Sequence, residues 1–317
     1  MGTVFKMDRN GSESVLHCFP NNLIDGHNPM AGLTRDAAGN LYGTTARGGT
    51  LGYGTVFKID PNGNETVLHS FDKTDGNQPE GNLVLDTSGN IFGTTFEGGD
   101  FSNCLYGCGV VFEMDPSGNE TVLHDFNLSD GGGPYGLVRD PAGNLYGTTN
   151  FGGSTFGGGA VFKVDTGGNE SVLHAFTGSD GNTPFAGLVR DSAGNLYGTT
   201  CGGGAAAHGV VFKVDANGNE TTRYNFKGYN GNCPWADLIL DAAGNLYGTT
   251  ASGGFDGRGV VFRVDPNGSE TVLHKFTGTD GKDPRAGLAR DSAGNLYGTT
   301  FKDNSPSNLG LVFKLTH

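Results

Sequence analysis

Apolar and polar residues along the chain form short segments that recur about every 50 residues. In the copy that begins at Ala186, the segments are 186–191 (AGLVRD), 195–200 (NLYGTT), 209–215 (GVVFKVD) and a fourth that corresponds to 270–276 (ETVLHKF). All four are rich in β-branched and aromatic residues and are bounded by Gly, Asn, Asp or Pro, which is typical of β-strands. Since no window shows sustained helical spacing of apolar residues, the pattern predicts an all-β protein.

The repeat also predicts the architecture. Its GN dipeptide places equivalent glycines 50, 54, 51, 50 and 50 residues apart, at Gly39, Gly89, Gly143, Gly194, Gly244 and Gly294. Four strands in a repeat of this length are the signature of a propeller blade. We therefore predict one domain over residues 1–317, a six-bladed β-propeller of four-stranded antiparallel blades.

The two ends of the chain supply partial repeats. The N-terminus offers 3–8 (TVFKMD) and 14–19 (SVLHCF), and the C-terminus ends in 310–317 (GLVFKLTH). We expect the N-terminal strand 14–19 to complete the last blade and close the ring, which removes open sheet edges. One of the two terminal VFK strands is then surplus, and the sequence does not say which. Because the chain begins inside a repeat, we expect Met1 to mark a truncated or cloned start.

The connections between strands are of two kinds. A D-x-x-G-N turn joins the first and second strands, and a D-x-x-G-[NS]-E turn joins the third and fourth; each keeps one length in all six copies. Asp and Gly are the residues such tight turns need. The other connections vary in content, and those between the second and third strands vary in length from 8 to 13 residues. We call the end of the blades that carries them the variable face, and expect function there.

One position on the variable face differs in every repeat. The residue that follows the proline before the first strand is Met30, Glu80, Tyr135, Phe185, Trp235 or Arg285. Two residues further on, Asn82 and Asp237 stand where other copies have Gly32, Gly187 and Gly287. We predict that these side chains surround the mouth of the central channel and bind a small-molecule, glycan or peptide ligand. Aromatic rings beside charged groups suit a carbohydrate-like ligand. The alternative is that the aromatic residues only plug the channel.

Residues present in nearly every copy are expected to be scaffold. A histidine recurs on the fourth strand, at His17, His69, His124, His174 and His274, with Tyr224 in its place in one copy. We expect it to hydrogen-bond a neighbouring turn or strand, and we predict no metal site and no cofactor. Gly43 and its equivalents are expected to let adjacent sheets approach.

The cysteines give one further expectation. Cys104 and Cys108 lie in the one enlarged loop, where a local disulfide is favoured over half of a metal site. Cys201 and Cys233 could also pair.

Two other functions stay open beside ligand binding. As an enzyme, a hydrolase or lyase acting on a glycoside or polysaccharide, the chain would use Glu80 and Asp237 as its carboxylates. No nucleophile, metalloprotease or phosphate-loop motif supports this. The chain could also be a purely structural surface module.

Charge and composition narrow the partners. With a formal net charge of -13 and a pI near 4.9, the surface should repel nucleic acid and anionic lipid. No run of 18 apolar residues is present, so no membrane insertion is expected. We expect a monomer.

The whole chain, read as GNLYGTT…GG…GxVFKxD…GNETVLHSF…DG…P, resembles the GloVer-type β-propeller repeat of bacterial proteins. Such proteins often carry cell-surface anchors, so the resemblance implies an extracellular or cell-surface propeller. It implies no catalytic residues. The first residues, MGTVFKMD, do not have the pattern of a signal peptide, so the expected location follows from the resemblance alone.

Overall fold

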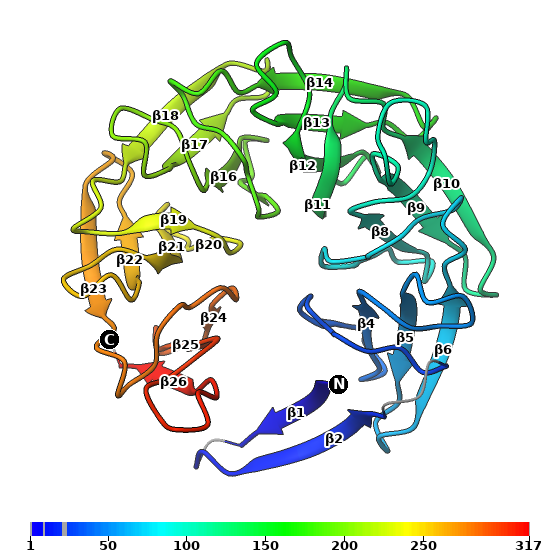
Figure 1. Cartoon of the computed structure of the whole chain (residues 1–317), viewed down its shortest axis with the longest axis horizontal. Coiled ribbons are helices and arrows are strands. Elements are labelled where there is room, and N and C mark those ends of the chain that lie inside the picture. The colour runs from blue at the N-terminus through cyan, green and yellow to red at the C-terminus, as the bar shows by residue number, and fades with distance from the viewer. Residues whose placement is uncertain (1, 9, 21–23, 317) are drawn as a thin grey trace. The chain divides into compact units, whose positions relative to one another are not determined.

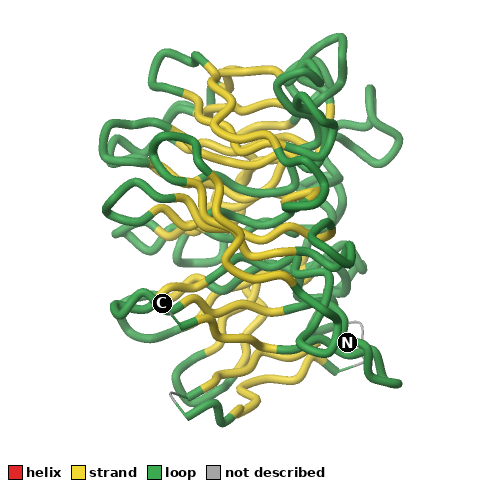
Figure 2. The backbone as a smooth tube through the Cα atoms, turned by 90° about the vertical axis from the view of Figure 1, so that its left-hand side faces the viewer, coloured by secondary structure: helices red, strands yellow, loops and turns green. Residues whose placement is uncertain are grey.

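The structure is a computed structural model that describes residues 2–8, 10–20 and 24–316. The regular secondary structure of these residues consists of β-strands alone, and loops connect the strands (Figure 2). No helix in the described ranges has the length and apolar character that crossing a membrane requires.

Most strands belong to sheets in which each strand pairs with the next one along the chain (Figure 1). The first three four-stranded sheets are β3 (Thr34–Arg35), β4 (Leu41–Thr45), β5 (Thr55–Ile59) and β6 (Glu65–Ser70); β7 (Val84–Leu85), β8 (Ile91–Thr95), β9 (Val110–Met114) and β10 (Glu120–Asp125); and β11 (Gly132–Arg139), β12 (Leu145–Phe151), β13 (Ala160–Val164) and β14 (Glu170–Ala175).

The remaining sheets are more varied. A fourth four-stranded sheet is β15 (Val189–Arg190), β16 (Leu196–Thr200), β17 (Val210–Val214) and β18 (Glu220–Asn225). A five-stranded sheet holds β19 (Asn232–Pro234), β20 (Ile239–Leu240), β21 (Leu246–Ser252), β22 (Val260–Val264) and β23 (Glu270–Lys275). A three-stranded sheet holds β24 (Ala289–Arg290), β25 (Leu296–Thr299) and β26 (Val312–Leu315), and β1 (Gly2–Met7) pairs with β2 (Glu13–Phe19). The predicted fold class, an all-β six-bladed propeller, is confirmed.

The chain divides into two compact units. Unit 1 is Met1–Leu145 with Val164–Glu170, and unit 2 is Tyr146–Lys163 with Ser171–His317. The single domain over 1–317 stays a prediction.

The terminal strands settle which VFK segment belongs to the last sheet. The C-terminal β26 pairs with β25 and takes the third place there, whereas the N-terminal β1 pairs with β2 in register from Gly2–Phe19 to Met7–Glu13. Both VFK strands therefore pair with another strand, so neither is left unpaired. The place of β2 as the closing fourth strand stays a prediction.

The predicted first strands are shorter than expected. In the copy at Ala186, only Val189 and Arg190 pair, with Tyr197 and Leu196. The strand ends there because Asp191 begins the turn: its carboxylate accepts the N–H groups of Ala193 and Asn195 at 3.0 and 2.8 Å. Gly194 completes the turn with φ +88, a conformation that L side chains rarely adopt. The variable residue that follows each proline therefore lies before the paired residues of the predicted first strand and not within them. Tyr135 is the exception, because it lies in β11.

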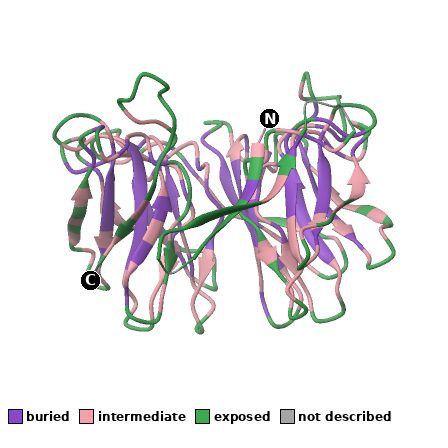
Figure 3. Cartoon of the chain, turned by 90° about the horizontal axis from the view of Figure 1, so that it is seen from below, coloured by how far each residue is buried: buried purple, intermediate pink, exposed green. Residues whose placement is uncertain are grey.

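Phenylalanines join successive sheets within each unit. Buried residues gather on the middle strands, and the outermost strands are more exposed (Figure 3). In five places a phenylalanine at the end of an outer strand packs edge-to-face on one in the third strand of the next sheet, with ring centroids 5.0–5.3 Å apart. The pairs are Phe19–Phe57, Phe71–Phe112, Phe176–Phe212, Phe226–Phe262 and Phe276–Phe313.

The recurring strand glycine makes room for this ring. Gly198 pairs with Phe212 across β16 and β17, and a Cβ on Gly198 would lie 2.6 Å from the Phe212 ring and 2.9 Å from Leu188. The expectation that Gly43 and its equivalents let adjacent sheets approach is corrected: they accommodate a ring of their own sheet, and Gly43 in the same way faces Phe57.

Replacing Gly198 by Ala should therefore lower the free energy of unfolding by about 1–3 kcal/mol, because the added methyl overpacks the Phe212 ring. Chemical denaturation followed by circular dichroism measures this. Gly287→Ala is the control, since a Cβ there meets only Asp237 atoms at 3.8 Å or more. Equal stability of the two variants would contradict the assignment.

Candidate functional site

The backbone before each proline fixes where the variable residue lies. Gln78 precedes Pro79 and has a left-handed φ of 55, and Thr183, Cys233 and Asp283 repeat this conformation with φ 55–56. The Gln78 N–H donates to the carbonyl of Tyr53 at 3.0 Å, and the Gln78 carbonyl accepts the N–H of Phe96 at 2.9 Å. These bonds hold the strained residue between two loops, so the following variable residue starts from a fixed backbone.

In unit 1, two of the predicted site residues come together. The Tyr135 hydroxyl donates to a carboxylate oxygen of Glu80 at 3.4 Å. Burial raises the pKa of Glu80 above its usual value, and the hydrogen bond from Tyr135 opposes that rise. Burial likewise raises the pKa of the Tyr135 phenol, so this hydroxyl keeps its proton. The side chain of Met30, another predicted site residue of unit 1, is 64% exposed.

Asn82 and Asp237 connect neighbouring repeats. The Asn82 side-chain oxygen accepts the N–H of Gly32 at 2.7 Å, and an Asp237 carboxylate oxygen accepts the N–H of Gly187 at 2.6 Å. A Cβ on Gly32 would lie 2.8 Å from that Asn82 oxygen, which explains why glycine stands opposite a polar side chain. These bonds account for both residues as contacts between repeats; a ligand-binding role for them stays a prediction.

In unit 2, four planar groups from three successive repeats form a stack. Phe185 and Trp235 lie face to face with centroids 3.9 Å apart and an interplanar angle of 4°. The Arg285 guanidinium lies over the Trp235 ring at 5.1 Å and over the Phe301 ring at 4.8 Å. Asp283 holds this guanidinium through hydrogen bonds of 2.9 and 2.8 Å.

The stack uses ring faces that a sugar would otherwise cover, because Phe185 and Trp235 pack on each other. Both alternatives for these aromatic residues, ligand binding and a channel plug, stay predictions. The structure thus groups Glu80 with Tyr135 in unit 1, and Phe185, Trp235 and Arg285 in unit 2. That both groups line one opening stays a prediction.

Unit 1 also contains a cleft that sequence reasoning missed. Its volume is about 390 Å³, and Arg47, Gly52, Tyr53, Asn77, Gln78, Glu97 and Tyr106 line it. The lining comes from the variable loops of two successive repeats and from the segment before Pro79. The signal in the sequence was the enlarged loop of 13 residues around Tyr106, whose cysteines predict only a disulfide or half of a metal site.

Hydrogen bonds connect the polar side chains of this cleft. One Glu97 carboxylate oxygen accepts the side-chain amides of Asn77 at 2.8 Å and Gln78 at 2.7 Å. The charge of Glu97 raises the pKa of Glu80, and that of Arg47 lowers it. Glu80 therefore lies within the electrostatic influence of the cleft, although it does not line it.

A disulfide fixes the enlarged loop. Cys104 and Cys108 are bonded, and the backbone carbonyl of Tyr106 between them accepts the N–H of Gly98 at 2.8 Å. The Tyr106 side chain is 57% exposed, so its ring stands at the edge of the cleft with a free surface. Cys201 and Cys233 form a second disulfide.

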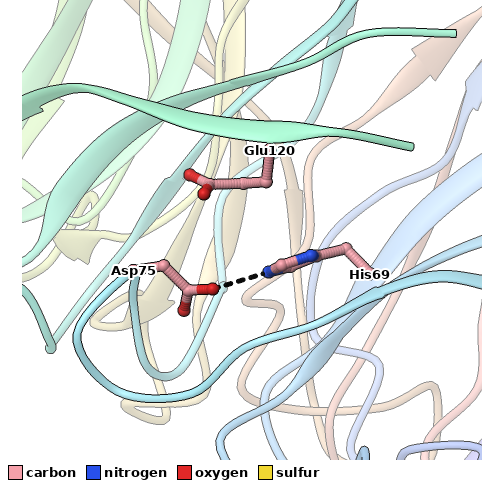
Figure 4. Close-up of side chains that lie close together, drawn as sticks. All are labelled: His69, Asp75 and Glu120. Carbon is pink, nitrogen blue, oxygen red and sulfur yellow. Dashed lines mark hydrogen bonds and ion pairs between the residues drawn. The ribbon is translucent and has the colours of Figure 1, made fainter. Parts of the chain in front are cut away.

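Four of the five recurring histidines, His69, His124, His174 and His274, make the hydrogen bond to a neighbouring turn that their pattern predicted, whereas His17 Nε2 has no hydrogen-bond partner among the described residues. His69 Nε2 lies 2.9 Å from a carboxylate oxygen of Asp75, in the loop after its own strand, and Glu120 from the next outer strand lies beside the pair (Figure 4). One nitrogen and two carboxylates are a donor set that can hold a divalent metal ion. In each of three such groups the donor atoms lie within 4.8 Å of one another: His69, Asp75 and Glu120; His124, Asp130 and Glu170; and His174, Asp180 and Glu220.

The fold and these repeated contacts define a six-bladed β-propeller built from one tandem repeat. The model of the Gloeobacter/Verrucomicrobia repeat matches residues 1–192 and 156–317. The chain belongs to this family.

Solved structures similar to this chain are also propellers. A streptogramin B lyase aligns with a TM-score of 0.63 at 16% identity, covering 94% of this chain and 86% of that one. XC5397, a gluconolactonase from Xanthomonas campestris, has a TM-score of 0.55 at 12% identity and 92% and 88% coverage. A luciferin-regenerating enzyme has a TM-score of 0.57 at 16% identity and 92% coverage of both chains. At these identities the likeness shows the fold alone. No curated protein matches the chain significantly.

Removing the Cys104–Cys108 bond should loosen the loop that carries Tyr106. We expect a Cys104→Ser/Cys108→Ser variant to be cut by chymotrypsin after Leu105 or Tyr106 several times faster than the parent chain, because the loop loses its covalent constraint. Limited proteolysis with mass spectrometry gives the rates. Cys18→Ser, which removes an exposed free thiol, is the control. An unchanged cleavage rate would show that the backbone alone holds the loop.

Proposed function

We propose that this chain is a non-catalytic binding propeller that holds a carbohydrate-like ligand at its variable face, in the cleft of unit 1. The observation that carries the proposal is the cleft itself, since two variable loops build it while the rest of the repeat stays uniform. A volume of about 390 Å³ is within the range of small-ligand sites.

The residues that line the cleft suit a sugar ring, which has an apolar face and polar edges. Tyr53 and Tyr106 offer aromatic surface, which packs against the C–H face of a sugar. Glu97 accepts hydroxyl hydrogens and is held in place by Asn77 and Gln78. Arg47 is exposed at the cleft and offers paired N–H donors to a hydroxyl or carboxylate of the ligand.

The carboxylates of the enzyme alternative are engaged in other contacts. Glu80 is hydrogen-bonded to Tyr135, and Asp237 accepts a backbone N–H. The lyase and lactonase activities belong to the structural neighbours, and a shared fold does not carry an activity. No specific observation favours a hydrolase or lyase here.

Binding is tested with one variant and a control from the same loop. Tyr106→Ala should weaken the affinity for a glycan found on an array by about tenfold or more, since a partly buried aromatic contact is lost. Leu105→Ala should leave affinity unchanged, because Leu105 is 82% exposed and does not line the cleft. Isothermal titration calorimetry measures both, and circular dichroism checks that both variants fold.

Three results would overturn this assignment. The parent chain binds no glycan, or it binds only peptides, or Tyr106→Ala binds as tightly as Leu105→Ala. A Trp235→Ala variant is measured alongside: loss of binding in that variant with retention in Tyr106→Ala would place the ligand at the aromatic stack of unit 2.

We also propose that the protein works outside the cell, as a monomer without nucleic-acid partners. Two disulfides support the location, because such bonds persist in oxidising compartments, and the net charge of -13 opposes contact with nucleic acid. Surface biotinylation of intact producing cells should label the protein. Recovery only from the intracellular fraction, with Cys104 and Cys108 reduced in mass spectrometry, would contradict the location.

A further inference from the structure

Basic side chains cover the aromatic rings of most second strands. The second strand of every repeat has a tyrosine or phenylalanine at the same position, and in five repeats a Lys or Arg cation lies over that ring, 5.4–6.0 Å from its centroid. The pairs are Lys58–Tyr42, Arg139–Phe92, Lys163–Tyr146, Arg290–Tyr247 and Lys314–Tyr297. A cation in this position is attracted by the negative face of the ring.

Two positions of the repeat supply these cations. The first is a lysine of the third strand, which pairs with the ring in register, as Lys58 does with Tyr42. The second is an arginine on the first strand of the following repeat, as Arg290 on β24 is for Tyr247 on β21. One of the two is enough: Leu85 holds the arginine position in the repeat that follows Tyr42, and there the lysine covers the ring.

Tyr197 is the ring that lacks this cover. Among the described residues no Lys or Arg lies over it, although Lys213 pairs with it in register. The arginine position of the following repeat holds Leu240. Burial raises the pKa of Tyr197 and the charge of Arg223 opposes the rise, but the Arg223 guanidinium donates to the backbone carbonyl of Pro266. Neither of the two usual positions therefore places a cation on this ring.

A cleft lies where the cation is missing. Its volume is about 350 Å³, and it is separate in sequence from the cleft of unit 1, since all of its lining residues belong to unit 2. Tyr197 and Asp191 line it from one repeat, and Leu240 and Asp241 line it from the next. The aspartates open the D-x-x-G-N turns, so the uniform turns and not the variable loops build this cleft.

The charge of the lining favours a cation. Arg190 contributes one positive charge, and Asp191 and Asp241 contribute two negative charges, which leaves a net charge of about -1. Burial raises the pKa values of both aspartates, but hydrogen bonds from the asparagine of each turn outweigh it, so both pKa values lie below their usual range. The Arg190 guanidinium lies against its own turn, because a Cβ on Gly194 would be 3.1 Å from its Nη2.

Arg139 shows how a guanidinium sits at an equivalent ring. It lies 5.4 Å from the Phe92 centroid, and its Nη2 is 3.9 Å from a carboxylate oxygen of Asp86. In the repeat with the cleft, Tyr197 holds the position of Phe92, and Asp191 holds the position of Asp86. The ring and the carboxylate are thus both present at the cleft, and only the guanidinium is lacking.

We propose that the cleft at Tyr197 binds a guanidinium group on an aliphatic stem, such as the side chain of an arginine. The cation lies over the Tyr197 ring beside the Asp191 carboxylate, and the stem packs along Leu240. A guanidinium is favoured over an ammonium because leucine has replaced the arginine of the repeat, whereas Lys213 still holds the lysine position. This second site goes beyond the proposed carbohydrate cleft and does not depend on it.

The proposal is tested by a ligand-observed NMR titration of the full chain with N-acetyl-arginine amide. The parent chain should bind this probe with a Kd in the millimolar range, because one cation–π contact beside a carboxylate is weak. N-acetyl-citrulline amide has the same shape without the charge and should not bind. Leu240→Arg places the chain's own guanidinium in the cleft and should weaken binding of the arginine probe by about tenfold or more.

Leu85→Arg is the matched control. It makes the same change at the same position of another repeat, beside a ring that Lys58 already covers, and should leave the affinity unchanged. Tyr197→Leu removes the ring and should also weaken binding, which provides a second variant if Leu240→Arg does not fold. Circular dichroism checks the fold of each variant.

Four results would overturn the proposal. The parent chain does not bind the arginine probe, it binds the citrulline probe equally well, a folded Leu240→Arg or Tyr197→Leu variant binds as tightly as the parent, or Leu85→Arg loses binding to the same extent. A titration with n-butylguanidinium separates two sources of the same group. Equal affinity for both probes supports a small free guanidinium compound, and tighter binding of the arginine probe supports an arginine of a partner chain.

Discussion

The edge-to-face phenylalanine pair between successive sheets is the interaction on which the rest of the structure depends. In five places the ring at the end of one sheet's outer strand packs against a ring in the third strand of the following sheet, and all of these side chains except Phe313 are at most 2% exposed. An aromatic pair contributes about 0.5–1.5 kcal/mol beyond the burial of its area. The ring needs a glycine opposite it, so the glycine, the ring and the spacing of the turns recur together.

A scaffold fixed in this way leaves other positions free to vary. The strained residues Gln78, Thr183 and Asp283, each before a proline, are hydrogen-bonded to two loops, so the backbone there does not depend on the side chain that follows. The loops between the second and third strands end in the same sheets whatever their length. Variation at these places can therefore build a cleft such as the one between Tyr53 and Tyr106 without disturbing the core.

The fold could be predicted from the sequence because its cause is local and repeated. Turn residues such as Asp191 and Gly194 act within five residues, and a 50-residue period multiplies the signal. The candidate site was harder to predict because its contacts join different repeats. The variable position after the proline was a visible signal. The stacking of Phe185 on Trp235 and the hydrogen bond from the Gly32 N–H to Asn82, however, depend on how neighbouring repeats meet. The cleft was missed because Arg47, Gln78 and Glu97 have no pattern in common, and only folding brings them together.

We propose that variable loops on this uniform scaffold form a sugar-binding cleft in unit 1. A crystal structure of the chain with an oligosaccharide bound would test this. We expect a sugar ring packed on Tyr106 with a hydroxyl in hydrogen-bond contact with Glu97. A ligand bound elsewhere, with the cleft filled only by water, would contradict it.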